Sequence, residues 1–279
     1  MISGHTHQAY NCVIDGRLVT SADKYGTLVT RIDLKLDPRT RDIVSAQAEN
    51  IIVRTDVYAA DMEQTALITP HEELAKPLAS RFVGSVTATL LARANDAGES
   101  VLGNIIADAQ LAATADGPDG AVIAFTNPGG IRTDIEKRGS GSVTYAELFA
   151  CQPFGNDLVT LSLSGAQIRQ LLEQQWRANR PPVILHTSRG FTYSWDSTRP
   201  LGDRVVPGSI KLNGKPIAPE ERLRVTVNNF LAGGGDSFTV LAAGTDARFG
   251  VHDVAAFDAY FRRNSPLSPG PLDRISRLR

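Results

Sequence analysis

Two histidines at the start of the chain have the type and spacing to bind a metal. In Gly4-His5-Thr6-His7 the imidazoles stand at i and i+2, and on an extended strand both would lie on one face. Neutral imidazole is a ligand for Zn, Mn, Fe, Ni or Co. A metal centre needs at least three protein ligands, so two do not complete one. The pair predicts either part of a metal site or a flexible histidine pair near a terminus.

A glycine-containing loop could bring the backbone close to a ligand. Asn127-Pro128-Gly129-Gly130-Ile131-Arg132 follows a stretch that is typical of a buried strand. Arg132 would stand at the mouth of this loop, where its guanidinium could donate paired hydrogen bonds to an oxyanion or to hydroxyls. The alternative is an ordinary turn with a solvated arginine.

A second turn, Gln152-Pro153-Phe154-Gly155-Asn156, holds an aromatic ring between proline and glycine. Phenylalanine is most often a core residue. Pro153 and Gly155 disfavour a strand or helix interior here, so Phe154 could instead project as a stacking platform.

The stretch from Asn228 to Phe238 is the most informative in the chain. Three glycines end a predicted strand and are followed directly by Asp236. Such backbone freedom is costly unless the chain must turn tightly or touch a ligand. A carboxylate at this point can accept two hydrogen bonds from a sugar diol. The alternative is a loop in which the aspartate only caps the backbone.

The elements that would position these residues change character along the chain. Residues 13–54 alternate like strands, with Asp15-Gly16 as a hairpin turn and Ile32, Leu34 and Leu36 on one face. Thr69-Pro70 is typical of a helix start, so we expect a helix over about 70–82, kinked or ended by Pro77, at a domain boundary.

Residues 95–279 alternate between helical and strand patterns. The periodicity predicts helices over 101–111, 145–149 and 255–261, and one capped by Ser164 with Ile168, Leu171, Leu172 and Trp176 on its apolar face. It predicts strands over 121–125, 157–163, 191–195, 210–212 and 224–228, with a hairpin at Asn213-Gly214.

Composition limits the classes of function. The 279 residues, 42% hydrophobic and 21% charged, exclude a disordered chain and suggest about two domains. A net charge of −1 argues against a nucleic-acid polymer or an anionic membrane as partner. No apolar run is long enough for a membrane span, and the N-terminus does not have the pattern of a signal peptide. Cys12 and Cys151 could pair once or not at all.

The ordered motifs of this chain resemble one family. The segments GHTH, LGNIIADAQ, NPGGIR, QPFGND, LSGAQIRQLLEQ and NNFLAGGGDSF together look like the 5'-nucleotidase family, and most like bacterial secreted members. Those members join a metallophosphoesterase domain to a C-terminal nucleotide-specificity domain. The resemblance implies an α+β fold with an α/β/β/α-type layered domain, preceded by a linker helix and the terminal strands of an incomplete metallophosphoesterase sandwich. The implied limits are 1–57 for the remnant, 58–94 for the linker and 95–279 for the specificity domain.

The resemblance also assigns roles to residues. It implies that His5 and, with it, His7 are metal ligands, that Phe154 and Phe230 stack the nucleobase, and that Asp236 binds the ribose hydroxyls. The implied substrate-binding set is Asn127, Gly130, Arg132, Phe154, Gly155, Asn156, Phe230, Gly235 and Asp236. A planar base stacked on aromatic rings would gain about 1–3 kcal/mol per ring.

The chain departs from the family pattern at three points. Gly98-Glu99-Ser100 stands where members often have an arginine before the LGN motif, with Arg93 the nearest basic residue. Ser237 stands where glycine is frequent. The family's other metal ligands lie far upstream of GHTH, and only four residues precede His5 here. We therefore expect that two divalent ions (Zn, Mn, Co or similar) belong to the complete enzyme and that this chain binds none stably.

The implied activity is hydrolysis of nucleoside 5'-phosphates by the complete enzyme, outside the cytoplasm (extracellular or periplasmic). This chain is expected to bind a nucleotide or nucleoside without turnover, and to self-associate through its incomplete N-terminal sheet. The alternatives are a stand-alone nucleoside-binding module, or a relative that acts on cyclic nucleotides, nucleotide sugars or sulfur esters.

Overall fold

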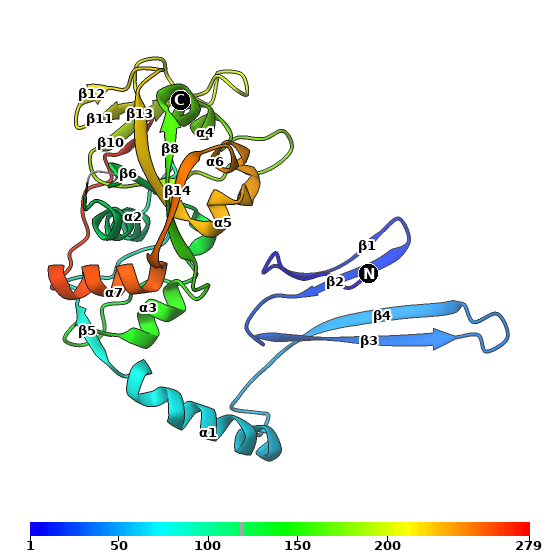
Figure 1. The fold of residues 1–279 in the computed structure, drawn as a ribbon. Coiled ribbons are helices and arrows are strands. Elements are labelled where there is room, and N and C mark those ends of the chain that lie inside the picture. Colours follow the sequence, from blue (N-terminus) through cyan, green and yellow to red (C-terminus); the bar gives the residue numbers. More distant parts are fainter. Residues whose placement is uncertain (118–119) are drawn as a thin grey trace. The chain divides into compact units, whose positions relative to one another are not determined.

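The computed structural model describes residues 1–117 and 120–279, and the chain divides into two compact units, Met1–Leu74 and Ala75–Arg279 (Figure 1). This division falls within the segment expected to be the linker. The domain limits expected at 57/58 and 94/95 stay predictions. No helix in the described part of the chain is both long and apolar enough to span a bilayer.

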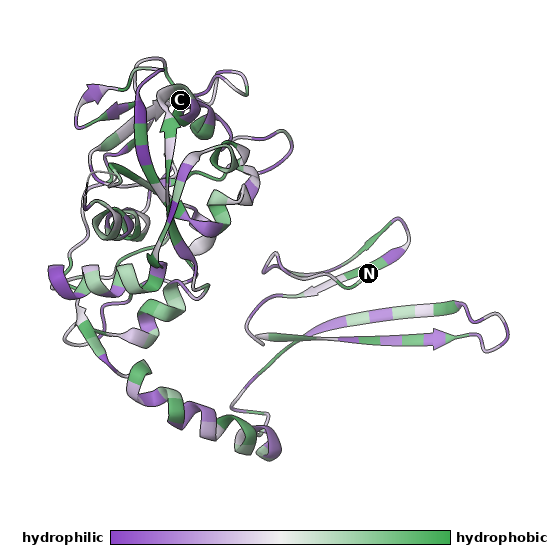
Figure 2. Ribbon diagram, in the orientation of Figure 1, coloured by the Kyte–Doolittle hydropathy of each residue, from purple (hydrophilic) through white to green (hydrophobic). Residues whose placement is uncertain are grey.

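The first unit is built from two antiparallel hairpins. They comprise β1 (Ala9–Ile14), β2 (Arg17–Ala22), β3 (Leu28–Leu36) and β4 (Ile43–Ile52). The predicted turn at Asp15-Gly16 is confirmed, with positive φ at both residues. Hydrophobic and hydrophilic stretches alternate along β3 and β4 (Figure 2). Leu34 and Leu36 are more than half exposed, but self-association through this unit remains a prediction.

The predicted helix start at Thr69 is wrong. Helix α1 runs from Met62 to Ala79, because Asp61 accepts a hydrogen bond from the backbone N–H of Gln64 and caps the helix eight residues earlier. Thr69 lies inside the helix, where its hydroxyl donates to the carbonyl of Thr65. The helix also continues through Pro70 and Pro77.

The second unit is a mixed α+β domain, as expected, although the finer layered description stays a prediction. A five-stranded sheet has the order β14-β8-β13-β6-β9. Its strands are β6 (Ile123–Thr126), β8 (Asp157–Ser164), β9 (His186–Thr187), β13 (Arg222–Asn228) and β14 (Thr245–His252). Strand β13 is parallel to β6 and antiparallel to β8.

Two smaller sheets complete the domain. A four-stranded sheet contains β10 (Phe191–Trp195), β11 (Lys211–Leu212), β12 (Lys215–Pro216) and β15 (Ile275–Arg277). A two-stranded sheet contains β5 (Phe82–Ser85) and β7 (Ser142–Thr144). The hairpin predicted at Asn213-Gly214 is confirmed as the turn between β11 and β12.

The helices pack on these sheets through apolar faces. They are α2 (Val101–Thr114), α3 (Tyr145–Cys151), α4 (Gly165–Glu173), α5 (Asn229–Ala232), α6 (Thr239–Ala242) and α7 (Asp253–Asn264), with short 3₁₀ turns η1 (Pro128–Gly130) and η2 (Gly235–Ser237). The predicted cap at Ser164 is confirmed as a reciprocal capping box with Gln167. Ile168, Leu171 and Leu172 are buried in the main core, as their spacing predicts.

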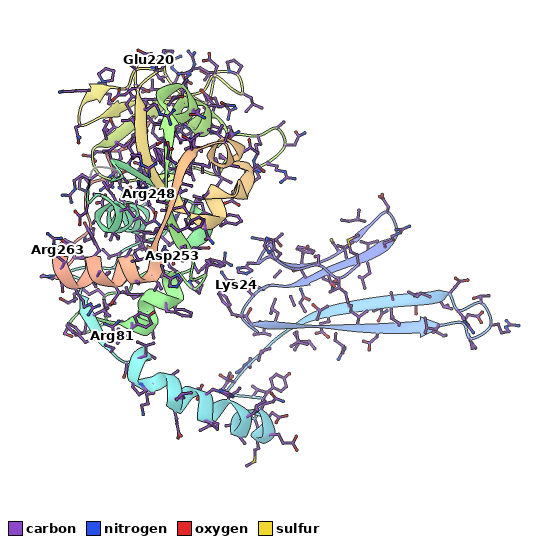
Figure 3. All side chains as sticks on the ribbon, in the orientation of Figure 1. Lys24, Arg81, Glu220, Arg248, Asp253 and Arg263 are labelled. Carbon is purple, nitrogen blue, oxygen red and sulfur yellow. The ribbon has the colours of Figure 1, made fainter. Side chains whose placement is uncertain are left out.

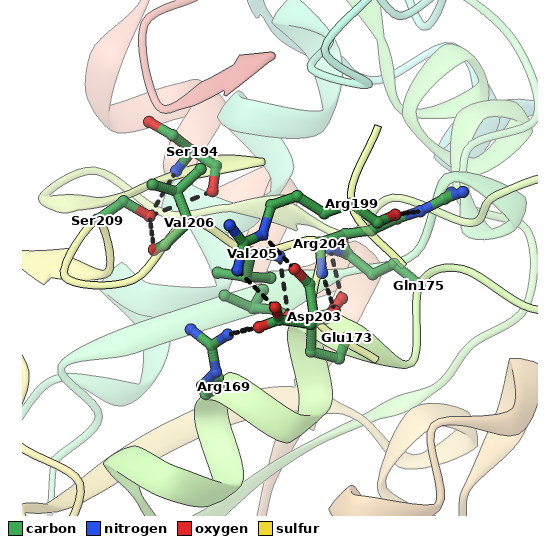
Figure 4. A network of polar contacts seen from close by, with 11 residues as sticks. Arg169, Glu173, Gln175, Ser194, Arg199, Asp203, Arg204, Val205, Val206 and Ser209 are labelled. Carbon is green, nitrogen blue, oxygen red and sulfur yellow. Dashed lines mark hydrogen bonds and ion pairs between the residues drawn. The ribbon is translucent and has the colours of Figure 1, made fainter. Parts of the chain in front are cut away.

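Helix α4 also anchors the loop before β11 through a polar network (Figure 4). The buried Glu173 carboxylate accepts hydrogen bonds from the backbone N–H groups of Arg204 and Val205, each at 2.8 Å. Arg169 joins Glu173 to Asp203. Backbone donors thus satisfy a buried charge, as burial of a carboxylate requires.

The two cysteines are unpaired. Cys12 is exposed in the first unit and Cys151 is buried in the second. Burial raises the pKa of the Cys151 thiol to about 12, so it stays protonated and unreactive at neutral pH.

Candidate functional site

Three loops meet at one edge of the five-stranded sheet. Strands β6 and β13 are parallel neighbours, with Thr226 opposite Ala124, so both end at the same edge. Strand β8 runs the other way, with Leu158 opposite Asn228, so it begins there. Three loops that the sequence analysis identified separately as candidates therefore meet at this edge. They are residues 127–132, 152–156 and 229–237.

A polar pair links the first and third of these loops. The Nδ2 of Asn127 donates to the Oδ2 of Asp236 at 2.8 Å, and the Nδ2 of Asn228 donates to the Oδ1 of Asn127 at 3.2 Å. Asn127 and Asn228 are 4% and 3% exposed, while Asp236 is partly exposed. Two buried amides therefore support a carboxylate that can still reach a ligand.

The glycine run shapes the backbone around that carboxylate. Gly234 has φ +87° and Asp236 has φ +53°, so the chain turns through the left-handed region on both sides of Gly235. A Cβ at Gly235 would lie 2.6 Å from the ring of Phe230. Gly235 is therefore required by the close approach of that ring, which lies against the backbone immediately before Asp236.

The other aromatic ring lies beside Arg132. The guanidinium carbon of Arg132 is 5.6 Å from the centroid of Phe154, and its Nη1 donates to the carbonyl of Gly129. The backbone N–H of Arg132 donates to the carbonyl of Cys151, which ties the first loop to the second. Phe154 and Phe230 are 53% and 48% exposed, unlike Phe125 and Phe238, which are fully buried.

Asn156 has a structural partner that the sequence did not indicate. Its Nδ2 donates to the Oδ2 of Asp253 at 3.0 Å, and the backbone N–H of Asp253 donates to the carbonyl of Asn156. Asp253 is the first residue of helix α7 (Figure 3), and burial raises the pKa of its carboxyl group. In the sequence, the only sign of this contact is an acidic residue, Asp253, at the start of a predicted helix, where a carboxylate is favoured. Asn156 thus fixes the second loop to α7. Gly155, with φ +61°, completes the turn.

The histidine pair does not lie on a strand. His5 and His7 have φ of +69° and +54°, and the backbone N–H of Thr6 donates to the carbonyl of Gly4, so the segment is a turn. Alternation on an extended strand therefore does not apply to these imidazoles. Within residues 1–117 and 120–279, no group of three or more His, Cys, Asp or Glu side chains could hold a metal ion. The ring of His7 packs edge-on to Tyr25.

The structure shows why Gly98, the first residue of the Gly98-Glu99-Ser100 segment before the LGN motif, has no side chain. Gly98 has φ +91°, and a Cβ there would lie 2.5 Å from the side chain of Ile184. A larger residue would be strained in this backbone and would collide with Ile184. The packing of Ile184 therefore requires glycine at position 98.

Comparisons with known proteins identify the domain that carries this site. The family model of the 5'-nucleotidase C-terminal domain matches residues 82–243. The chain is 32% identical over 233 residues to the endonuclease YhcR of Bacillus subtilis, which covers 83% of this chain and 18% of YhcR. It is 30% identical over 251 residues to the cell wall protein Lmo0130 of Listeria monocytogenes, which covers 86% of this chain and 32% of that protein.

A solved structure extends the likeness to the fold. The 5'-nucleotidase precursor of Thermus thermophilus superposes with a TM-score of 0.80 at 27% identity, over 99% of this chain and 59% of that one. The chain thus spans less than two thirds of the length of each of these relatives. The chain belongs to the 5'-nucleotidase family, of which it contains the C-terminal domain.

Proposed function

We propose that the second unit binds a nucleoside or nucleotide at the edge formed by loops 127–132, 152–156 and 229–237. The observation that carries this proposal is the combination, at one sheet edge, of two half-exposed phenylalanine rings with a carboxylate supported by buried amides. The rings of Phe154 and Phe230 suit the faces of a planar base, and Asp236 suits the ribose diol.

Each group has a distinct part in binding. Base stacking contributes about 1–3 kcal/mol per ring and tolerates different bases. The Asp236 carboxylate can accept from both ribose hydroxyls, and hydrogen bonds to a charged group are worth about 1.5–3 kcal/mol each. Arg132 can add donors to a hydroxyl or a phosphate oxygen, because its fork presents several N–H groups at once.

The complete protein would be a phosphohydrolase that releases phosphate from nucleoside 5'-phosphates. Two divalent ions would supply the activated water and polarise the phosphoryl oxygen. The described part of this chain does not fit such a centre, since no three potential ligands come together and the His5–His7 segment is a turn. The role proposed for this chain is ligand binding. A location outside the cytoplasm belongs to the same proposal and is supported by the cell wall protein among the relatives.

Calorimetric titration with adenosine and with AMP tests the binding site. We expect saturable heat with both ligands and none with ribose alone, because stacking supplies a major part of the affinity. Phe154→Ala combined with Phe230→Ala should weaken adenosine binding at least tenfold, since about 1–3 kcal/mol is lost per ring. Phe82→Ala is the matched control, because Phe82 is 62% exposed but lies on the separate β5–β7 sheet. Absence of heat with adenosine, or equal affinity in the double variant, would overturn the proposal.

A further inference from the structure

We propose that Asn228 is a positioning residue that sets the preference of this site for a ribose diol. It does so by fixing the amide of Asn127, which in turn holds the carboxylate of Asp236. This inference rests on the proposed nucleoside site and adds to it a residue outside the set that the ligand would touch.

A backbone N–H group determines the orientation of the Asn228 amide and so the direction of the hydrogen bonds that follow. The Oδ1 of Asn228 accepts from the backbone N–H of Leu231 at 2.8 Å, as the N-cap of helix α5. A backbone N–H can only donate, so it settles which end of the Asn228 amide carries the oxygen. The Nδ2 of Asn228 must then face Asn127, where it donates to Oδ1.

The orientation of the Asn127 amide in turn determines which group faces the carboxylate of Asp236. With its Oδ1 accepting from Asn228, the Asn127 amide presents Nδ2 to the Oδ2 of Asp236. Both asparagines are buried, so water competes little for these bonds and the amides have one favoured orientation. The bond engages Oδ2 of Asp236 and leaves Oδ1 to accept from ribose hydroxyls.

Asn228 also connects the proposed stacking ring, Phe230, with the proposed acceptor for the ribose diol, Asp236. The helix that it caps begins at Asn229 and carries Phe230, the proposed stacking ring. One side chain thus holds the start of the ring's helix through its oxygen and the diol acceptor through its nitrogen. Substitutions that keep the oxygen and remove the nitrogen separate these two effects.

Two variants make that separation. Asn228→Asp keeps an oxygen for the N–H of Leu231 but places a second oxygen against Asn127, so the Asn127 amide must turn and present its own oxygen to Asp236. Asn228→Ser keeps a capping oxygen on a side chain too short to reach Asn127, and introduces no charge. Asn213→Asp is the control, because it makes the same chemical change at an exposed asparagine in the β11–β12 turn, outside the three loops of the site.

The test compares the affinities for adenosine and for 2',3'-dideoxyadenosine by calorimetry, with thermal unfolding of each variant alongside. We expect the wild-type chain to prefer adenosine. Asn228→Asp and Asn228→Ser should lose about tenfold in adenosine affinity and less than about twofold in dideoxyadenosine affinity, as expected for one displaced charged acceptor. Asn213→Asp should retain the preference.

The outcomes are distinguishable. If the wild-type chain binds neither nucleoside, the proposed function fails and this inference fails with it. If the wild-type chain prefers adenosine and both Asn228 variants keep the same preference, the positioning role alone is overturned. A purely structural role would lower both affinities together and would also contradict the inference.

Discussion

The side chains of Asn127 and Asp236 meet across 2.8 Å although 109 positions separate them in the sequence. They meet because β6 and β13 are parallel neighbours, so the residues that follow the two strands emerge at one sheet edge. The contact joins two loops into one site.

The carboxylate of Asp236 should determine recognition of the ribose. Asp236→Asn removes the charge that strengthens the bonds to the hydroxyls, so adenosine affinity should fall about tenfold while dideoxyadenosine affinity changes little. Calorimetry with the two nucleosides measures the difference. Asp96→Asn, at an exposed aspartate, is the control and should bind like the wild type. An unchanged adenosine affinity in Asp236→Asn would show that the diol is bound elsewhere.

The absence of a side chain at Gly235 should be needed for the position of the Phe230 ring. In Gly235→Ala the new Cβ would approach that ring to 2.6 Å, so the half-exposed ring must move. We expect adenosine affinity to fall about tenfold, as for partial loss of one stacking ring. Gly270→Ala provides the comparison, because no atom lies within 4 Å of the place that its new methyl group would occupy. Equal affinities in the two variants would contradict the packing argument.

The buried His186 should make the protein less stable in acid. Burial lowers the pKa of His186 from about 6.5 to about 4, and the ring is packed against Gly103. Between these pH values the unfolded chain binds a proton that the folded chain does not, so the free energy of unfolding falls as the pH falls. The loss reaches about 3 kcal/mol near pH 4.

Urea unfolding between pH 7 and pH 4 measures this dependence. His186→Leu should show a smaller decrease over that range, whatever its absolute stability, because it removes the titrating group. His71→Gln, at an exposed histidine of α1, should keep the wild-type slope. The same slope in His186→Leu as in the wild type would assign the acid sensitivity to other groups.

The chain should bind AMP without hydrolysing it. The described residues bring no three potential metal ligands together, so added Mn²⁺ or Zn²⁺ has no two-metal centre to complete. Phosphate release from AMP, measured with and without each metal, should stay at the level of the buffer. Turnover at ordinary enzyme rates would refute the prediction.

Local patterns predicted much of the second unit. The capping box at Ser164, the Asn213-Gly214 turn and the buried face of α4 follow from rules that involve only a few neighbouring residues. Strand β14 was missed because its side chains are all exposed and its apolar residues do not alternate clearly. The start of helix α1 is predicted about eight residues too far along the chain, because Asp61 and Thr69 are both favourable N-cap residues and only the structure shows that Asp61 is the cap.

The sequence predicts which loops form the site but not the contacts between their side chains. Glycine, proline and aromatic residues marked the loops, because each restricts or frees the backbone in a recognisable way. The contacts of Asn127 with Asn228, and of Asn156 with Asp253, depend on strand order and register, which short segments do not contain. The turn at His5 and His7 was missed for a similar reason, since positive φ at histidine has no strong local signal.

The most direct test of a nucleoside site at this sheet edge is a map of amide chemical-shift changes in ¹⁵N-labelled protein titrated with adenosine. We expect the largest changes to cluster in loops 127–132, 152–156 and 229–237 and to saturate together with one affinity. Changes centred on other elements, or no changes at saturating adenosine, would contradict it.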